Sequence, residues 1–459
     1  MNTCHLSSLT AAIALAFPAA AGAQTSNDEL LRELRELKAR VGDLEKKLKD
    51  TEAKLPPPGA SWGMTPEQSA ELNRVIVKTD ALEENNETWG FKGLTVSGYI
   101  EPTFIYNRRQ NRAGFQFLNQ QSDGYFYDTS YFGAAVLDLT KEMEGGTLWK
   151  LTLSPNRGVG ALIDGNSIIQ EASVSVPLDG LQTRLIAGQV PDWSGYEYQQ
   201  PTLNPFTTHN LLYDFTLPAG YTGIGISHAT GKWLMKGMLA NVNATTHGVG
   251  EKSVALVYRV DYSKGEYDGF GFAGLHGKSP NYNTGVNTMA HLFEIDGYYL
   301  RGDWALQAQA SVGMQKRGAI TPDADGNYRN ARWWGVSGLM GYAITPRLQG
   351  LLRADYINNR KNGGGLFTYN GYSGFDDDGQ LQFGNDGRNG IGPQLDGNLN
   401  RGANRYALSV GLKYAFNPNT TVKAEYRLDG ADRRVFEDVK DGEFKKLNQL
   451  FGTSLVVSF

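Results

Sequence analysis

The chain closes with LNQLFGTSLVVSF, residues 447–459. In an extended strand, alternate residues share a face, and here one face carries Phe451, Thr453, Leu455, Val457 and Phe459. This period-two pattern predicts a strand between an apolar and a wetter environment. The chain stops on an aromatic residue, and transmembrane barrel strands commonly place aromatics at the membrane interface. The ending therefore favours a transmembrane barrel, and the rest of the chain has to agree with it.

The composition excludes some classes of protein. The 459 residues carry a formal net charge of −4, a balance too mild to suggest a nucleic-acid partner. The 56 glycines and the 11% of aromatic residues suit many short strands and turns with interface aromatics. The single cysteine, Cys4, offers no disulfide framework.

The first 23 residues have the pattern of a secretory signal peptide. Leu6 to Phe17 is mostly apolar, Pro18 ends the run, and residues 21–23 offer a cleavage site of small residues. The segment before the apolar run contains no Lys or Arg. Beyond Ala23, no apolar run approaches the ~18 residues of a transmembrane helix, so any membrane span must be made of strands.

Residues 24–58 are predicted to form a coiled coil that ends in a stiff spacer of three prolines. Residues 26–29 form a capping box, and apolar residues then follow 4-3 spacing with Thr51 as the polar exception. These are Leu30, Leu34, Leu37, Val41, Leu44, Leu48 and Leu55. Flanking positions pair opposite charges, as Glu33 does with Lys38, which favours self-association over a free helix. Whether the coil makes dimers or trimers stays open. Residues 59–93 are predicted to form a linker helix.

From residue 94 to residue 459 the period is two, and the connections alternate in length. Seven short turns, such as those at 143–146 and 345–346, alternate with eight long polar loops. The long loops are expected near 108–129, 155–167, 191–219, 243–252, 279–287, 316–330, 358–402 and 431–446. This predicts an all-β, antiparallel transmembrane β-barrel of about 16 strands. Both termini then lie on the short-turn side, which places the coiled coil in the periplasm. A large soluble sandwich is disfavoured, because the apolar faces often end in aromatics such as Trp149 and Trp304.

Alternation places several cations inside the barrel as a basic ladder that would line the pore. They are Arg347, Arg353, Arg405, Lys413, Lys423 and Arg427, with Arg184 added from a distant strand. Inward carboxylates, among them Glu101, Glu294, Asp355 and Glu425, leave open the alternative that both signs simply pair. A dominant ladder would set up a transverse field that orients anionic or dipolar solutes.

The loop at 191–219 is the candidate constriction loop. It is too long for a simple connector and is rich in aromatics. Folded into the lumen, it would set Asp192, Glu197 and Asp214 against the basic ladder. An ordinary extracellular loop is the alternative. The loop at 358–402 is rich in Gly, Asn and Asp, which predicts an exposed flap.

The order of signal peptide, coiled coil, proline spacer and barrel resembles Gram-negative porins with an N-terminal periplasmic coiled coil. Residues 89–93 (WGFKG), 141–146 (KEMEGG) and 210–214 (NLLYD) resemble an uncharacterised proteobacterial porin-like group. The architecture is also similar to that of DcaP-like porins. The resemblance implies a homotrimer in the outer membrane that passes small hydrophilic solutes by diffusion, and DcaP-like members favour dicarboxylates and similar anions.

Two other classes of function are weighed against a porin. No HExxH, GxSxG or Walker motif is present, so we expect no enzyme and no cofactor. Residues 323–327 begin like a Ca²⁺ loop, but Trp334 stands at the position of its twelfth-residue Glu, so no metal site is expected. The serious alternative is a structural tether, in which the barrel anchors a coil that reaches toward the cell wall.

Overall fold

The computed structural model describes residues 74, 75, 77, 78, 91–117, 133–154, 167–281, 284–367, 372–375, 381–383, 387–393 and 398–459. The predicted signal peptide, the coiled coil and most of the linker helix lie outside these residues. Within the linker, residues 74, 75, 77 and 78 are helical. Among the described residues, no helix is both long and apolar enough to cross a membrane.

The barrel begins with two interrupted strands. The first consists of β1 (Leu94–Ile100) and β2 (Thr103–Asn107), and the second of β3 (Arg112–Gln116) and β4 (Ala135–Glu142). Twelve of the strands that follow are β5 (Leu148–Leu153), β6 (Ile169–Asp179), β7 (Thr183–Pro191), β8 (Gly220–Thr230), β9 (Trp233–Val242), β10 (Ala255–Ser263), β11 (Asp268–Ser279), β12 (Thr288–Arg301), β13 (Trp304–Gln315), β14 (Ala331–Thr345), β15 (Leu348–Asn358) and β18 (Arg405–Asn417). The last two are β19 (Thr420–Ala431) and β22 (Leu447–Ser458).

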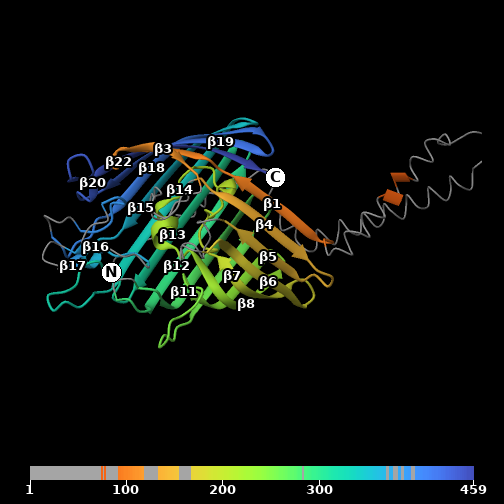
Figure 1. Ribbon diagram of the computed structural model, residues 1–459, viewed down its shortest axis with the longest axis horizontal. Helices are drawn as coiled ribbons and strands as arrows, with labels where there is room; N and C mark the ends of the chain where they lie inside the picture. The colour runs from red at the N-terminus through yellow and green to blue at the C-terminus, as the bar shows by residue number, and fades with distance from the viewer. Residues whose placement is uncertain are drawn as a thin grey trace, which may run out of the picture.

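All these strands pair antiparallel with their neighbours, and the ring is closed (Figure 1). β22 pairs with β19 on one side and with β1 and β2 on the other. When each interrupted pair is counted once, the 18-stranded sheet is a barrel of sixteen. The predicted antiparallel barrel of about 16 strands is therefore confirmed. Short hairpins outside the barrel are formed by β16 (Tyr372–Phe375) with β17 (Leu381–Phe383), and by β20 (Phe436–Asp438) with β21 (Glu443–Lys445).

Two of the predicted loops differ from expectation. The first was placed at 108–129, but β3 lies within this range and pairs with β2 through a tight turn, with Asn111 at φ 45°. Alternation over five residues is too short a signal to reveal β3. The loop at 358–402 was expected to be an exposed flap, yet its described residues Leu366, Phe367 and Ile391 are buried, so that prediction is wrong for this part.

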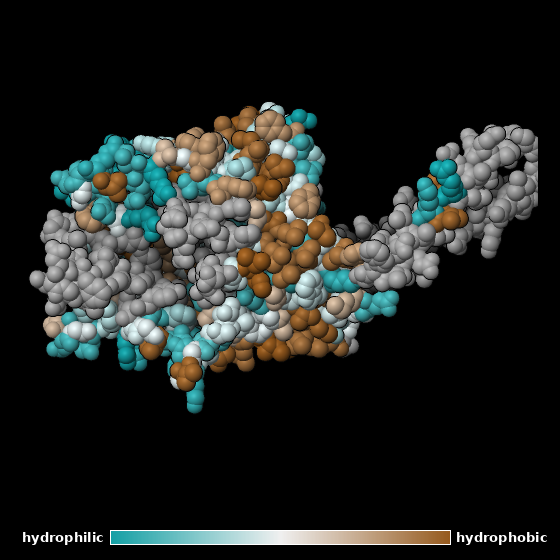
Figure 2. All heavy atoms as spheres, in the orientation of Figure 1, coloured by the Kyte–Doolittle hydropathy of each residue, from teal (hydrophilic) through white to brown (hydrophobic). Residues whose placement is uncertain are grey.

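Apolar side chains cover the outside of the barrel between two levels of aromatic residues. Near the short turns, Trp304 packs against Tyr342 and Trp233 against Tyr262, each pair with tilted rings whose centroids lie 4.7 Å apart. Trp334 marks the upper level on β14, eight residues from Tyr342. Eight residues of a strand span about 27 Å, or about 21 Å across a bilayer after tilt, which is close to the apolar band of membrane barrels. In Figure 2, hydrophobic surface gathers on the wall toward the short turns, whereas the long-loop end is largely hydrophilic.

Candidate functional site

The connection between β7 and β8, residues 192–219, lies inside the barrel, and we call it the inner loop. The Tyr196 hydroxyl lies 2.5 Å from Ser337 Oγ on β14. Further along, the backbone N–H of Leu211 donates to Asp355 on β15, and that of Thr208 donates to Glu425 on β19. The inner loop therefore follows the inner wall across several strands instead of projecting beyond the barrel.

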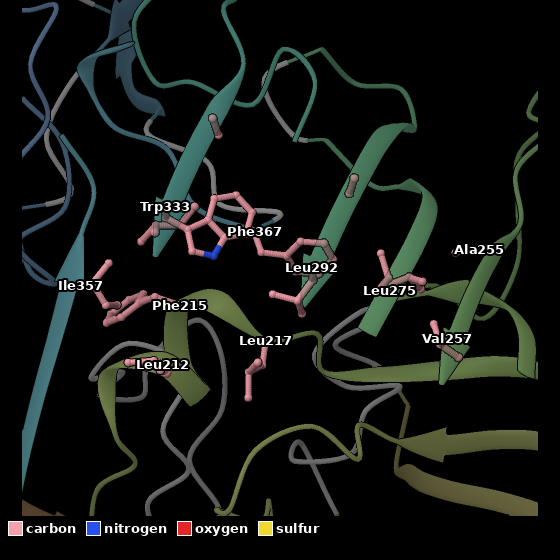
Figure 3. Packing of buried hydrophobic residues seen from close by; sticks show 14 of the residues in the cluster. Leu212, Phe215, Leu217, Ala255, Val257, Leu275, Leu292, Trp333, Ile357 and Phe367 are labelled. Carbon is pink, nitrogen blue, oxygen red and sulfur yellow. The ribbon is translucent and has the colours of Figure 1, made fainter. Parts of the chain in front are cut away.

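A short helix, α4 (Leu211–Thr216), fixes the second half of the inner loop. Its N-cap is Asn210, whose side chain accepts a hydrogen bond from the Tyr213 backbone N–H at 2.8 Å. Leu212 and Phe215 of α4 are buried in one hydrophobic cluster with Trp333 and Ile357, inward-facing residues of β14 and β15 (Figure 3). An apolar helix face thus meets an apolar patch of the wall, which gives this segment a reason to fold inward.

Arg353 on β15 is the main polar anchor of the inner loop. It is fully buried, and its Nη1 donates to Glu197 Oε1 at 2.8 Å and to the Thr208 carbonyl at 2.7 Å. Its Nη2 donates to Thr208 Oγ1 at 2.9 Å and to Glu425 Oε1 at 3.2 Å. The guanidinium also lies 4.8 Å from the ring centroid of Phe206. One wall residue therefore binds three separate points of the inner loop.

Arg427 on β19 extends this anchor. It donates to Thr208 Oγ1 at 2.9 Å and to the His209 carbonyl at 2.7 Å. It also shares Asp429 with Arg405 of β18, at 3.1 and 2.9 Å respectively. Arg405 stacks over Phe436, with 4.7 Å between its guanidinium carbon and the ring centroid. These arginines and carboxylates form a buried polar network, which we call the anchor network.

The other predicted ladder residues lie apart from this network or at its margin. Lys413 and Lys423 occupy directly opposite positions on β18 and β19, with Lys413 half-buried and Lys423 buried. Arg347 is not in a strand: it lies exposed in the turn between β14 and β15, so its place in the ladder is corrected. Arg184 on β7 donates to Ser175 Oγ and to the Gly146 carbonyl, well away from the network.

The three loop acids have different partners. Glu197 contacts Arg353, as the sequence predicts. Asp192 instead accepts hydrogen bonds from the Tyr221 hydroxyl and from Ser194. Asp214 lies on α4, 3.9 Å from His209. Burial lowers the pKa of His209 to about 3, helped by the nearby charges of Arg353, Lys423 and Arg427, although a hydrogen bond to the Tyr198 carbonyl opposes the shift.

Sequence reasoning missed Thr208 and Asp429 as members of the anchor network. Alternation indicates that Asp429 faces inward, but no sequence signal tells which loop residue will meet it. A second inward cluster surrounds Arg259 of β10. Its guanidinium donates to both carboxylate oxygens of Asp296, at 2.6 and 2.9 Å, and to Asp261 at 2.8 Å. Sequence reasoning did not predict this cluster.

Three arginines of the predicted basic ladder are buried and do not line an open pore. Arg353, Arg405 and Arg427 are each at most 1% exposed and are paired with carboxylates. Arg353 and Arg427 hold the inner loop, and Arg405 is joined to Arg427 through Asp429. Inward charges that remain half-exposed include Lys150, Arg184, Asp261 and Lys413. Within the described residues, no group of three or more His, Cys, Asp or Glu residues could hold a metal ion.

A family model matches residues 58–255 and 271–459, which is most of the chain. The chain belongs to the family described as "Protein of unknown function (DUF3138)". The DUF3138 match includes the inner loop and every strand of the anchor network. Its gap at 256–270 covers most of β10 and the short turn to β11. No curated protein matches the chain.

Several solved structures are similar to this DUF3138 protein. OmpT of Vibrio cholerae, folded in vitro, has 10% identity and a TM-score of 0.48, over 80% of this chain and 97% of that one. The anion-selective porin from Comamonas acidovorans has 9% identity and a TM-score of 0.49, over 80% and 99% of the two chains. OmpF of Salmonella typhi has 11% identity and a TM-score of 0.47, over 80% and 97%.

Proposed function

We propose that the protein is an outer-membrane channel for passive diffusion of small hydrophilic solutes and catalyses no reaction. The observation that carries the proposal is the inner loop, held by the anchor network inside a closed barrel. An apolar outer band between aromatic levels suits a bilayer. Barrels with this number of strands are wide enough to enclose an aqueous channel, and a loop that lines one wall narrows such a channel without sealing it.

Ion selectivity in this proposal depends on fewer cationic side chains than the predicted basic ladder contains. The arginines of the anchor network are neutralised by the carboxylates that they contact, so they contribute little field to the lumen. Arg184 and Lys413 are half-exposed, and Arg184 donates to the Ser175 hydroxyl and to the carbonyls of Gly146 and Ser175. We therefore expect a modest preference for anions, dicarboxylates included.

The test is conductance of the refolded full-length protein in a planar bilayer under a KCl gradient. Stepwise openings with a reversal potential on the chloride side are expected. Openings with cation preference would retain the channel and refute the anion preference. Arg184→Gln and Lys413→Gln should each reduce the reversal potential, whereas Arg347→Gln, in an exposed turn, is the matched control and should change it least.

A structural tether is the second candidate, and the apolar packing inside the barrel favours it. Leu212, Phe215, Trp333 and Phe367 belong to one buried hydrophobic cluster that occupies part of the interior. Removal of residues 24–58 separates the two functions. A tether would lose its attachment to the cell wall while its barrel still inserts, whereas a channel would still conduct. The same deletion tests the proposed homotrimer, because the periplasmic coil is its expected source of self-association.

A further inference from the structure

A basic patch lies on the outside of the barrel at the long-loop end of β11 to β14. Strand register places its residues in two rows. One row runs through His276, His291, Met314 and Arg332, which are consecutive cross-strand partners. The next row outward runs through Lys278 and Met289 to Lys316, whose backbone N–H donates to the Met289 carbonyl. We call Lys278, Lys316, Arg332, His276 and His291 the rim patch, and all five side chains are exposed.

The rows below the rim patch give its depth in a membrane. One step down, the outward positions are Gly274, Phe293, Val312 and Trp334. Below them come Phe272, Ile295, Ala310 and Val336. Each step is two residues, or about 7 Å along the strand. The sequence of rows is thus apolar, then aromatic, then cationic, which places the rim patch at the height of the lipid head groups.

The three barrel strands that follow β14 do not repeat this pattern at their upper edge. On β15, β18 and β19 the last paired outward positions are Asn358, Tyr406 and Gly430, none of which is charged. The cations of the rim patch are also not neutralised locally, because Lys278, Lys316 and Arg332 have no carboxylate within ion-pair distance among the described residues. The nearest described acid of the adjoining loop, Glu251, pairs with His247.

The hydrogen-bonding groups of the patch point to an anionic oxygen ligand. The Tyr258 hydroxyl lies 3.2 Å from His276 Nε2, and the Nδ1 atoms of His276 and His291 lie 3.2 Å apart. Among the described residues, the hydrogen bond of Lys278 Nζ is to a backbone carbonyl, that of Lys252, at 3.4 Å. The exposed lysine and arginine side chains thus have donors available for a ligand. Phosphate oxygens are the acceptors that such a group of Lys and Arg side chains binds best.

We propose that the rim patch binds the phosphate-bearing head group of an outer-leaflet lipid. Lys278, Lys316 and Arg332 contact the phosphates, and the aromatic row beneath, with Phe293 and Trp334, lies against the upper acyl chains. The sector of β11 to β14 therefore faces lipid and not a second copy of the chain. This inference rests on the proposed placement in the outer membrane but not on conduction, so either can fail without the other.

The experiment measures binding of lipid A to the detergent-solubilised full chain at low ionic strength, with dephosphorylated lipid A as the comparison probe. A triple variant, Lys278→Gln, Lys316→Gln and Arg332→Gln, removes the cations of the rim patch. Each cation near an anionic head group contributes about a fivefold change in affinity, so the triple variant should bind on the order of a hundredfold more weakly. Wild-type binding should also weaken as salt is added.

The matched control is the triple variant Lys232→Gln, Lys264→Gln and Arg301→Gln, which removes three exposed cations at the short-turn end. It should bind lipid A as the wild type does. Equal loss in both triple variants would show attraction to net charge alone and overturn the site. Equal binding of lipid A and its dephosphorylated form, or wild-type affinity in the rim variant, would overturn it as well. In bilayers that contain no lipid A, the wild type and the two triple variants should have the same conductance.

Discussion

Arg353 has Glu197, Asp355 and Glu425 around a single guanidinium that water does not reach. Buried charges of this kind contribute little net stability as a set, because their desolvation offsets their attraction. Removing one partner is different, because the remaining charges are then left buried and unpaired. The main effect of the anchor network is therefore to fix the position of the inner loop, and its net contribution to the free energy of unfolding is small.

The substitution Arg353→Met should release the inner loop. It leaves Glu197 and Glu425 without their cation, at a cost of about 3–5 kcal/mol, which is enough to detach the loop from the wall. We expect greater single-channel conductance and new protease cleavage between residues 192 and 219. Arg347→Met is the control, because Arg347 lies exposed in the turn between β14 and β15. Wild-type conductance and protease resistance in Arg353→Met would contradict the anchoring role.

His209 makes the inner loop sensitive to acid. Its pKa is about 3 in the folded chain and about 6.5 when unfolded, so the unfolded loop binds the proton more readily. The contribution to stability is complete above pH 6.5 and is lost as the pH falls from there toward 3. Asp214, at 3.9 Å, favours the charged form but does not overcome burial and the neighbouring Arg353 and Arg427.

Burial raises the pKa values of Asp192 and Glu197 in the same loop to about 7, which opposes the effect of His209 as the pH falls. The test therefore compares wild type and variant: Trp193 fluorescence and protease sensitivity of the inner loop are followed between pH 6.5 and pH 4 in both. His209→Gln should be much less sensitive over this range. His247→Gln, in the loop between β9 and β10, should keep the wild-type response. If the acid response is unchanged in His209→Gln, a titratable residue other than His209 causes it.

At the scale of elements, the sequence is a good guide to strands and a poor guide to what loops touch. Alternation along β14, from Trp333 inward to Trp334 outward, follows directly from the pattern of side chains. Strand ends are less certain by a residue or two, which is why Arg347 was assigned to β15 and lies in the turn. The inner loop was recognised by its length and aromatics, but the choice of Arg353, and not Lys413, as the partner of Glu197 depends on three-dimensional packing that no local pattern encodes.

Gly195 tests how closely the inner loop fits the wall. It has φ +78°, and a Cβ atom there would lie 2.7 Å from Gln309 Nε2 on β13. Gly195→Ala should therefore displace the Gln309 side-chain amide from the inner loop and alter conductance slightly, beyond the cost of about 1 kcal/mol for a positive φ. Gly145→Ala is the matched control, since Gly145 has φ +84° and open space around its Cβ position. If the two variants have the same conductance and stability, the close approach of Gly195 to Gln309 does not position the inner loop.

At the scale of the whole molecule, the apolar band on the outside of the barrel requires a bilayer, and this can be tested with a single charge. Leu408 is exposed and lies in the row of Gly338, midway between the aromatic levels marked by Trp334 and Tyr342. Met289 is equally exposed but lies at the height of the rim patch. Leu408→Arg should destabilise the barrel in lipid vesicles by about 2–4 kcal/mol, whereas Met289→Arg should cost about 0–1 kcal/mol, because the cost of a charge falls from the bilayer centre to its edge.

Urea unfolding in vesicles measures both variants against the wild type. The two variants control for each other, because a soluble sandwich with the same surface would tolerate both arginines equally. Equal stability of Leu408→Arg and Met289→Arg would therefore refute the placement of the band in a membrane, and with it the channel. A graded loss would instead fix the height of the barrel in the bilayer independently of conduction, so that the inner loop, the anchor network and the rim patch could each be assigned a depth.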